Sequence, residues 1–200
     1  MAKPKLLDLF CGAGGAAMGY ERAGFEVVGV DIKPQPHYPF EFHQADALSY
    51  PLDGFNVIHA SPPCQAYVNL SNGKHPKLIE PIRTRLQNNR TLYVIENVCS
   101  APLENPILLC GSHFGLGVRR HRLFESPGLF LLNPDCNHRR SVRAYYGHSG
   151  WLVWKGRQSI FRGSIDQAPA DMGIGWMKTW GELRESIPPA YTEFIGKHLI

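Results

Sequence analysis

The chain has 200 residues, enough for one domain with a substantial core and barely enough for two. A composition of 44% hydrophobic and 19% charged residues excludes an intrinsically disordered chain, and no run of about 20 apolar residues indicates a membrane span. The net charge is +4, and the five cysteines are widely spaced without a CxxC pair, which argues against a disulfide framework and for a reducing compartment.

In the first half, short apolar runs alternate with helical patterns, which is typical of βαβ units and a parallel sheet. The strands expected there are 5–10, 26–32, 55–60 and 91–95, with a weaker run before Asp46. The expected helices are 16–23 and 76–88. A turn or short helix at 110–116 and a late strand at 121–125 follow. Beyond Ser126, prolines, glycines and aromatic residues predict loops and short strands, until helical patterns return at 179–186 and 191–200.

A glycine-rich turn follows the first expected strand. The run from Gly12 to Ala17 fits the pattern G-x-G-x-x-G/A, in which glycines permit a tight turn and let a ligand approach the backbone. Asp31 lies about 20 residues downstream, where a carboxylate can accept hydrogen bonds from ribose hydroxyls. The pattern predicts an adenosine-containing cofactor, with NAD, FAD and S-adenosylmethionine all open, or else a turn without a ligand. Asp46 is a candidate for contacting the adenine amino group, or a helix cap.

A cysteine and a glutamate follow two of the expected strands. Cys64 stands in Pro62-Pro63-Cys64-Gln65 after the strand at 55–60, and Glu96 follows the strand at 91–95. Because the carboxyl ends of parallel strands share one crevice, we expect both side chains beside the glycine turn. That arrangement suits covalent catalysis next to a nucleotide-like cofactor. Each residue alone is as well explained as a small buried side chain or a cap.

Positive charge gathers in the second half of the chain. Between Arg119 and Ile165 there are nine Lys/Arg and two Asp/Glu, interleaved with aromatic residues, whereas the rest has 12 basic and 15 acidic residues. This pattern indicates either a polyanion-binding surface or a solvated face whose arginines form internal ion pairs. Cys136-Asn137-His138, with Cys110 and His113, has metal-ligating residue types. Its spacing matches no standard zinc pattern, so we expect no metal site.

Four motifs, in order and approximate spacing, resemble those of the C5 cytosine-specific DNA methyltransferases. They are Asp8–Gly15, Pro63-Cys64-Gln65, Glu96-Asn97-Val98 and Arg120-His121-Arg122. The similarity resumes at 173–196, where Ile187–Thr192 looks like the tail of compact, phage-type members. The resemblance implies an α/β, Rossmann-like S-adenosylmethionine-dependent methyltransferase fold with a mostly parallel sheet. It also implies a catalytic cofactor-binding domain at 1–125, a reduced basic target-recognition segment at 126–172, and a C-terminal segment at 173–200 that returns to the catalytic domain.

The activity implied by the resemblance is transfer of a methyl group from S-adenosylmethionine to carbon 5 of cytosine in DNA, with S-adenosylhomocysteine as product. Cys64 would add to carbon 6, its pKa lowered near a helix start or cationic groups. Glu96 would share a proton with ring N3, for which burial should raise its pKa. Arg122, and less directly Arg120, would contact the ring oxygen. The same chemistry on RNA or a free pyrimidine nucleotide, and an inactive nucleic-acid-binding relative, stay open.

The resemblance thus assigns residues to three roles. The catalytic residues are Cys64, Glu96, Arg120 and Arg122. The cofactor-binding residues are Asp8, Phe10, Cys11, Gly12, Ala13, Gly14, Gly15, Asp31, Ile32, Asp46, Ala47 and Pro63. The substrate-binding residues are Gln65, Asn97, Arg139, Arg140 and Arg143, with Asn97 also fixing the loop geometry.

DNA, with the target cytosine flipped out of the stack, is the expected partner of a monomer without a metal or membrane contact. A restriction partner and a protein that supplies specificity are left open, and the expected location is the cytoplasm of a bacterium or phage-infected host. The chain departs from the family pattern at Val118, where glutamine is usual, and in its short recognition segment. It also lacks the usual Gly-Asn-Ser-Val, for which Pro189-Ala190-Tyr191-Thr192 is the candidate substitute.

Overall fold

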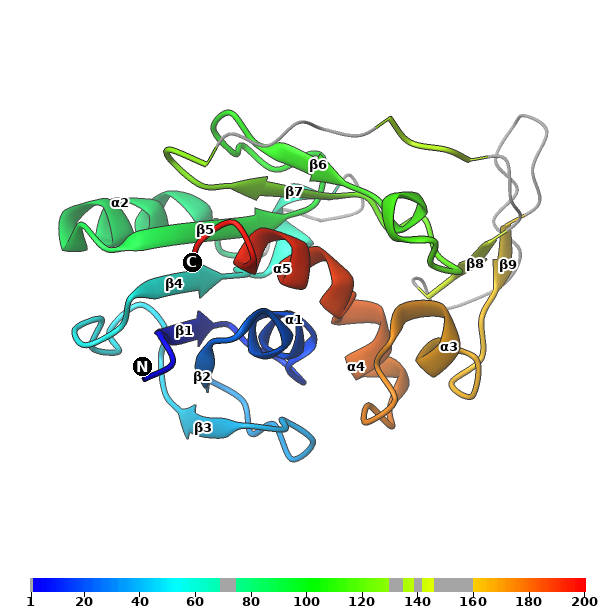
Figure 1. The fold of residues 1–200 in the computed structure, drawn as a ribbon, viewed down its shortest axis with the longest axis horizontal. Helices are drawn as coiled ribbons and strands as arrows, with labels where there is room; N and C mark the ends of the chain where they lie inside the picture. Colours follow the sequence, from blue (N-terminus) through cyan, green and yellow to red (C-terminus); the bar gives the residue numbers. More distant parts are fainter. Residues whose placement is uncertain (1, 69–74, 130–134, 139–141, 146–159) are drawn as a thin grey trace.

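The computed structural model describes residues 2–68, 75–129, 135–138, 142–145 and 160–200. Seven strands form one sheet in the order β3-β2-β1-β4-β5-β7-β6, visible edge to edge in Figure 1. The strands are β1 Lys5–Leu9, β2 Glu26–Asp31, β3 Glu41–Gln44, β4 Val57–Ala60, β5 Leu92–Asn97, β6 Ile107–Leu109 and β7 Arg122–Glu125. The first five are parallel, and β7 runs antiparallel to both β5 and β6.

The remaining elements are short helices and a separate strand pair. The α-helices are α1 Gly15–Ala23, α2 Ile79–Asn89, α3 Ala168–Met172, α4 Trp180–Glu185 and α5 Pro189–Gly196. Two 3-10 turns, η1 Cys64–Tyr67 and η2 Gly111–Phe114, follow β4 and β6. The parallel pair β8 Val142–Ala144 and β9 Ile160–Arg162 lies at the far end of the molecule from α2 (Figure 1).

The strands and helices predicted for the first half are confirmed, with ends that differ by one to three residues. The sequence did not predict β6 or α3. The last helix begins at Pro189, two residues before the expected Tyr191, because proline at the first helical position has the required φ and no N–H to leave unpaired. The expected division of the chain at residues 125 and 172 stays a prediction.

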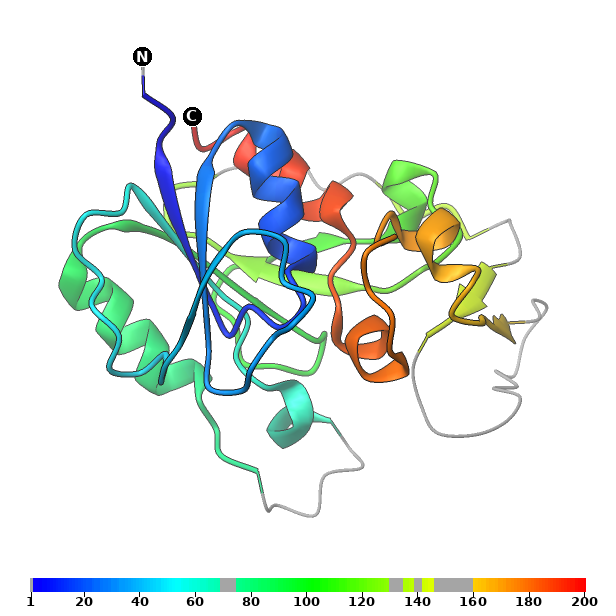
Figure 2. The ribbon, with the colours of Figure 1, turned by 90° about the horizontal axis from the view of Figure 1, so that it is seen from below.

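Helices cover both faces of the sheet, with α1 and α5 on one side and α2 on the other (Figure 2). Successive strand residues point to opposite faces, so neighbours in β1 enter different cores. Leu6 packs in one cluster with Tyr20 of α1 and Ile195 of α5. Leu7 packs in the other, with Ile82 of α2. Strands that are buried on both sides, such as β4, are those expected of a parallel sheet covered on both faces.

Close packing of α1 against α5 fixes the C-terminal segment beside the glycine turn. A Cβ on Gly19 would lie 2.1 Å from the Pro189 carbonyl oxygen, and one on Gly15 would lie 2.4 Å from the Ile187 carbonyl oxygen. No side chain fits at either position, so the backbones approach to a distance that only glycine allows. The chain just before α5 is thereby held against the start of α1.

A smaller apolar cluster joins α3 and α4 to the glycine turn and to Tyr145, which follows β8. Arg143 of β8 forms an ion pair with Asp171 of α3, with an Nη1–Oδ1 distance of 2.8 Å, and the Tyr145 hydroxyl donates to the same carboxylate. These contacts attach β8 to the main body. Within the described part of the chain, no helix combines the length and apolar character that a bilayer crossing needs.

Candidate active site

A cavity of about 280 Å³ lies at the carboxyl ends of β1, β2, β4 and β5. This is the edge of an α/β sheet at which ligands bind. Most of the predicted site residues line it. They are Asp8, Phe10, Cys11, Gly12, Ala13, Gly15, Asp31, Ile32, Pro63, Cys64, Gln65, Glu96, Asn97 and Arg122.

Other predicted residues lie outside the lining. Gly14, Asp46, Ala47, Arg120 and Arg143 do not border the cavity, and Arg139 and Arg140 fall outside the described residues. Asp46 is exposed, and its Oδ1 accepts a hydrogen bond of 2.9 Å from the Leu48 N–H within a turn; no helix of the described chain begins there, so Asp46 is not the helix cap that was the alternative expectation. Arg143 forms an ion pair with Asp171. For this arginine, the structure therefore shows an internal ion pair, which was the alternative to a polyanion-binding role.

The lining also contains residues that sequence reasoning missed. They include Lys33, Gln35, Ser61 and, from the C-terminal segment, Glu182, Arg184, Glu185, Ser186 and Ile187. The expected substitute, Pro189–Thr192, belongs instead to α5, where the Thr192 hydroxyl donates to the Ala16 carbonyl. A capping box, Thr179 with Glu182, marks the start of α4 in the sequence. No sequence signal places that helix near the cavity.

The conformation of the glycine turn depends on residues with positive φ and on hydrogen bonds to the Asp31 carboxylate. Phe10, Gly12 and Gly14 all have positive φ, and for Phe10 (φ 59) this is a costly conformation found mainly at functional sites. The backbone N–H groups of Gly12 and Lys33 donate to the two carboxylate oxygens of Asp31, at 3.0 and 2.9 Å. Asp31 therefore connects the turn after β1 to the end of β2.

Asp8 is a fully buried carboxyl that borders the cavity. Neither of its oxygens has a hydrogen-bond partner among the described residues. Burial raises its pKa well above the ordinary value, and the negative charges of Asp31 and Glu96 raise it further. The Ala17 N–H opposes this shift in part, although it does not reach hydrogen-bond geometry. A buried acceptor without a donor is the kind of group that a ligand satisfies.

Cys64 begins the turn η1, and the end of β5 holds its loop. The side-chain amide of Asn97 donates to the Pro62 carbonyl at 2.8 Å, which confirms the expectation that Asn97 fixes the loop. The expected lowering of the thiol pKa is wrong for the ligand-free molecule. Burial raises the pKa of Cys64, and the positive charge of Arg122 offsets this only in part. Desolvation of the thiolate outweighs the nearby cation here.

Glu96 is buried, and its Oε1 lies 2.9 Å from Nε of Arg122. The N–H does not point at that oxygen, so the contact is an ion pair without a hydrogen bond. Burial raises the pKa of Glu96 against the opposing charges of Arg122 and Arg120, as the sequence analysis predicted.

A buried polar chain leads away from Glu96. The Ser61 hydroxyl neighbours Glu96, whose pKa it lowers, and it lies 2.7 Å from Nε2 of His59; Nδ1 of His59 is 3.0 Å from the Tyr20 hydroxyl. Burial lowers the pKa of His59 to about 3, so its ring is neutral. If Ser61 donates to Glu96, His59 carries its proton on Nε2 and accepts from Tyr20 at Nδ1. The hydrogen bonds between Ser61, His59 and Tyr20 hold the Ser61 hydroxyl beside the Glu96 carboxyl.

Arg120 does not line the cavity but contacts a residue that does. It is buried with φ 28, and its guanidinium donates to the Arg184 carbonyl next to the cavity. Burial and the like charge of Arg122 lower its pKa to about 9. Arg120 thus joins the chain before β7 to the end of α4, and Arg122 is the guanidinium that faces the cavity.

These residues give the cavity a nucleophile, a carboxyl that holds its proton to higher pH than usual, and a guanidinium, beside a glycine turn that leaves room for a ligand. A thiol can add covalently to an electron-poor carbon, while a general acid and a cation stabilise the negative charge that the addition creates on the acceptor.

No protein-family model and no curated protein sequence matches the chain. Among solved structures, it is similar to a candidate DNA modification methyltransferase encoded within an E. coli prophage, at 22% identity and a TM-score of 0.49, covering 60% of this chain and 45% of the other. A Spodoptera frugiperda DNMT2 variant matches at 18% identity and a TM-score of 0.49, covering 81% and 55%. The chain therefore spans about half the length of these two proteins.

The S. pombe Dnmt2 methyltransferase matches over 97% of this chain and 98% of its own, at 13% identity and a TM-score of 0.59. At that identity the likeness concerns the fold alone. Together with the strand order and the two helical layers, it shows that this chain has the Rossmann-like α/β fold of a methyltransferase.

Proposed function

We propose that this protein is an S-adenosylmethionine-dependent DNA methyltransferase that modifies carbon 5 of cytosine through a covalent adduct with Cys64. One observation carries the proposal: Cys64, Glu96 and Arg122 line a single cavity together with the glycine turn. The three side chains come from the loop after β4, the end of β5 and the start of β7. An NAD-dependent oxidoreductase would need the glycine turn but has no use for this thiol and carboxyl.

The glycine turn and its surroundings fit an adenosyl cofactor. A Cβ at Gly12 would meet no atom within 4 Å, although the residue borders the cavity, so the turn leaves open space where a ligand can approach. Asp8 offers a buried acceptor without a partner, and Asp31 lies at the end of β2, where a carboxylate can face ribose hydroxyls. When bound, S-adenosylmethionine supplies an electrophilic methyl group.

Cys64 makes the substrate reactive. Carbon 5 of cytosine is a poor nucleophile, and addition of the thiolate to carbon 6 converts the ring into an enamine whose carbon 5 can accept the methyl group. Loss of the carbon-5 proton then expels the thiolate and restores the aromatic ring. Burial raises the pKa of the Cys64 thiol, and the positive charge of Arg122 opposes this shift, so Arg122 favours the thiolate that attacks carbon 6.

Glu96 and Arg122 stabilise the charge that addition creates on the ring. Burial raises the pKa of Glu96, which favours the protonated carboxyl that ring N3 requires. Arg122, paired with Glu96, provides a cation for the ring oxygen. The buried chain Ser61–His59–Tyr20 lies next to Glu96 and positions the Ser61 hydroxyl beside it.

A duplex substrate has its cytosine inside the base stack, so flipping is required at a cost of a few kcal/mol. The concentration of positive charge between Arg119 and Ile165 supplies the electrostatic attraction to a polyanion. DNA is the substrate that the motifs indicate, and RNA and dCMP are the alternatives that an assay must separate.

The test is a competition assay with labelled S-adenosylmethionine and equal amounts of duplex DNA, tRNA and dCMP. We expect label in DNA as 5-methylcytosine, no label with Cys64→Ser, and full activity with Cys99→Ser, which replaces an exposed cysteine outside the cavity. Label confined to tRNA or dCMP would overturn the DNA assignment. Full activity of Cys64→Ser would overturn the mechanism.

A further inference from the structure

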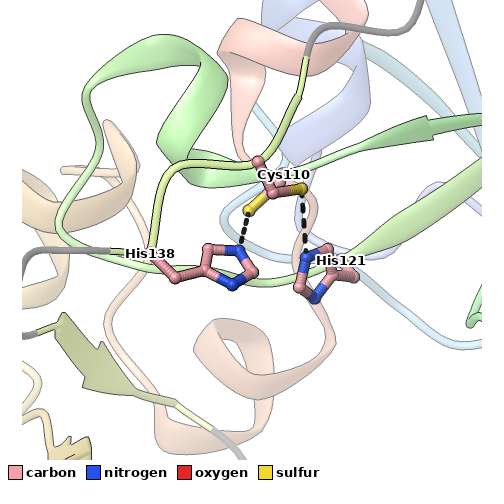
Figure 3. A group of neighbouring side chains, drawn as sticks. Cys110, His121 and His138 are labelled. Atoms are coloured by element: carbon pink, nitrogen blue, oxygen red, sulfur yellow. Dashed lines mark hydrogen bonds between the residues drawn. The ribbon is translucent and has the colours of Figure 1, made fainter. Parts of the chain in front are cut away.

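Two cysteines and two histidines converge on the far side of Arg120 and Arg122. Cys110 follows β6, His121 precedes β7, and Cys136 and His138 belong to the described segment 135–138. One sulfur or ring-nitrogen atom of each residue lies within 4.8 Å of all the others. Figure 3 shows the side chains of Cys110, His121 and His138 facing one another.

The spacing of the donor atoms is that of a tetrahedral metal site. Sγ of Cys110 is 3.4 Å from Nε2 of His138, and Sγ of Cys136 is 3.4 Å from Nε2 of His121. Zinc bonds of about 2.3 Å to sulfur and 2.0–2.1 Å to nitrogen, at tetrahedral angles, place sulfur and nitrogen ligands about 3.5–3.6 Å apart. These two sulfur–nitrogen distances are close to that value, and the remaining donor atoms, which lie within 4.8 Å of one another, would have to move closer together around an ion at the centre.

We propose that Cys110, His121, Cys136 and His138 form a structural zinc site. Two thiolates and two imidazoles are a ligand set that zinc takes in closed, four-coordinate sites, with no position left for water. The expectation of no metal rested on linear spacing. Three separate segments supply the ligands, and the sheet turns them toward one point, so no short sequence pattern marks the site.

Neighbouring groups are placed to support the ligands. The Ser112 hydroxyl donates to Sγ of Cys110 at 3.2 Å, and the Asn137 N–H donates to the Ser112 oxygen at 3.2 Å. Arg119 donates from its guanidinium to the His138 carbonyl at 3.1 Å. Such outer contacts orient ligands and hold negative charge on sulfur. Sγ of Cys110 lies 3.0 Å from the Arg119 carbonyl oxygen, and zinc would bind both cysteines as thiolates, so that any proton they carry in the free protein passes to solvent.

The site would connect two functional regions of the chain. His121 stands between Arg120, which supports the cavity, and Arg122, which lines it. Cys136 and His138 come directly before the strongly basic part of the sequence. Zinc would therefore fix the start of that segment against the end of β7 that carries Arg122. This role is independent of whether the protein transfers methyl groups.

The experiment uses the full-length protein, stripped with a chelator under reducing conditions, reloaded with Zn²⁺ and dialysed. We expect one zinc per chain by mass spectrometry, and a Co²⁺-loaded form with the d–d absorption of a tetrahedral thiolate site. Cys110→Ser and Cys136→Ser should lose the metal, whereas Cys99→Ser, an exposed cysteine outside the cluster, should keep it. His138→Cys should retain zinc, because it preserves four ligands.

A further variant tests the supporting contacts. Ser112→Ala should weaken zinc binding about 10–100-fold, the usual effect of removing an outer contact. Circular dichroism and stabilisation by S-adenosylhomocysteine identify variants that still fold, so that lost metal is not confused with unfolding. The proposal is overturned if reduced, folded protein binds no zinc, or if Cys110 and Cys136 form a disulfide in protein kept under reducing conditions. It is also overturned if a variant that carries both Cys110→Ser and Cys136→Ser still binds one zinc ion. Zinc content does not depend on methyltransferase activity, so the two proposals can fail separately.

Discussion

Replacing Asp8 by Asn should stabilise the ligand-free protein at neutral pH. Asp8 has 0% exposure, and neither carboxyl oxygen has a partner among the described residues. Burial, and then the charges of Asp31 and Glu96, raise its pKa in the folded state. A carboxyl whose pKa is raised on folding leaves stability intact below its unfolded pKa of about 3.9 and lowers stability as the pH rises toward the folded pKa.

The size of the effect follows from the missing hydrogen bonds. An unsatisfied buried polar group costs about 1–3 kcal/mol, and a charged one costs more. Asn at this position is still an unsatisfied buried polar group, so the substitution removes only the part of the cost that comes from the charge. We therefore expect the free energy of unfolding to rise by about 1–2 kcal/mol at pH 7–8. For a chain of this length, that corresponds to roughly 2–8 °C in Tm.

The assay is thermal unfolding of wild type and Asp8→Asn from pH 4 to pH 8. The difference should be near zero at the acidic end and grow with pH, while Asp53→Asn, which changes an exposed carboxylate, should give no such trend. Stabilisation by S-adenosylhomocysteine should be smaller in Asp8→Asn than in wild type. A variant that is less stable than wild type at pH 7–8, or a difference that does not vary with pH, would refute this account of Asp8.

Three other outcomes are expected. Gly19→Ala should lower the free energy of unfolding, measured in urea, by about 1–3 kcal/mol, because its Cβ would lie 2.1 Å from the Pro189 carbonyl oxygen. The control Gly181→Ala should not lower it, because its Cβ would be 3.8 Å from the nearest atom. Equal stability of the two variants would contradict the close packing of α1 against α5. Glu125→Gln should cost about 1.5–3 kcal/mol by the same measurement, because it removes the carboxylate that accepts two hydrogen bonds of 2.8 Å from the buried Arg83, which keeps its ion pair with Glu80; equal stability of the variant and wild type would contradict this. Glu96→Gln should slow methyl transfer about 100-fold or more and remove the part of the pH–rate profile in which the rate falls as Glu96 loses its proton; an unchanged pH–rate profile would count against this role.

The order of strands and helices in the first half was predictable, because each element carries its own local signal. Alternating apolar runs and the glycine turn predict β1, α1 and β2, and the rule for parallel sheets then places Cys64 and Glu96 at the same edge. The structure confirms that both line the cavity. This part of the site needed no information about contacts between distant segments.

Features that depend on distant contacts were not predictable. Ser186 and Ile187 line the cavity because α5 packs on α1 through Gly19, a contact between residues about 170 apart in sequence. The thiol pKa of Cys64 was expected in the wrong direction, because the sequence shows a nearby cation motif but not the extent of burial. The same holds for Cys110 and Cys136, which only the folded sheet brings together.

The central claim is that Cys64 bonds to a cytosine ring in the cavity that the glycine turn lines. It is tested most directly with duplex DNA containing 5-fluorocytosine, incubated with the protein and S-adenosylmethionine, because fluorine cannot leave carbon 5 as a proton does. We predict a stable protein–DNA complex whose cross-linked peptide maps to Cys64 by mass spectrometry, and no complex with Cys64→Ser. A cross-link at another residue, or a complex formed equally well by Cys64→Ser, would contradict the account.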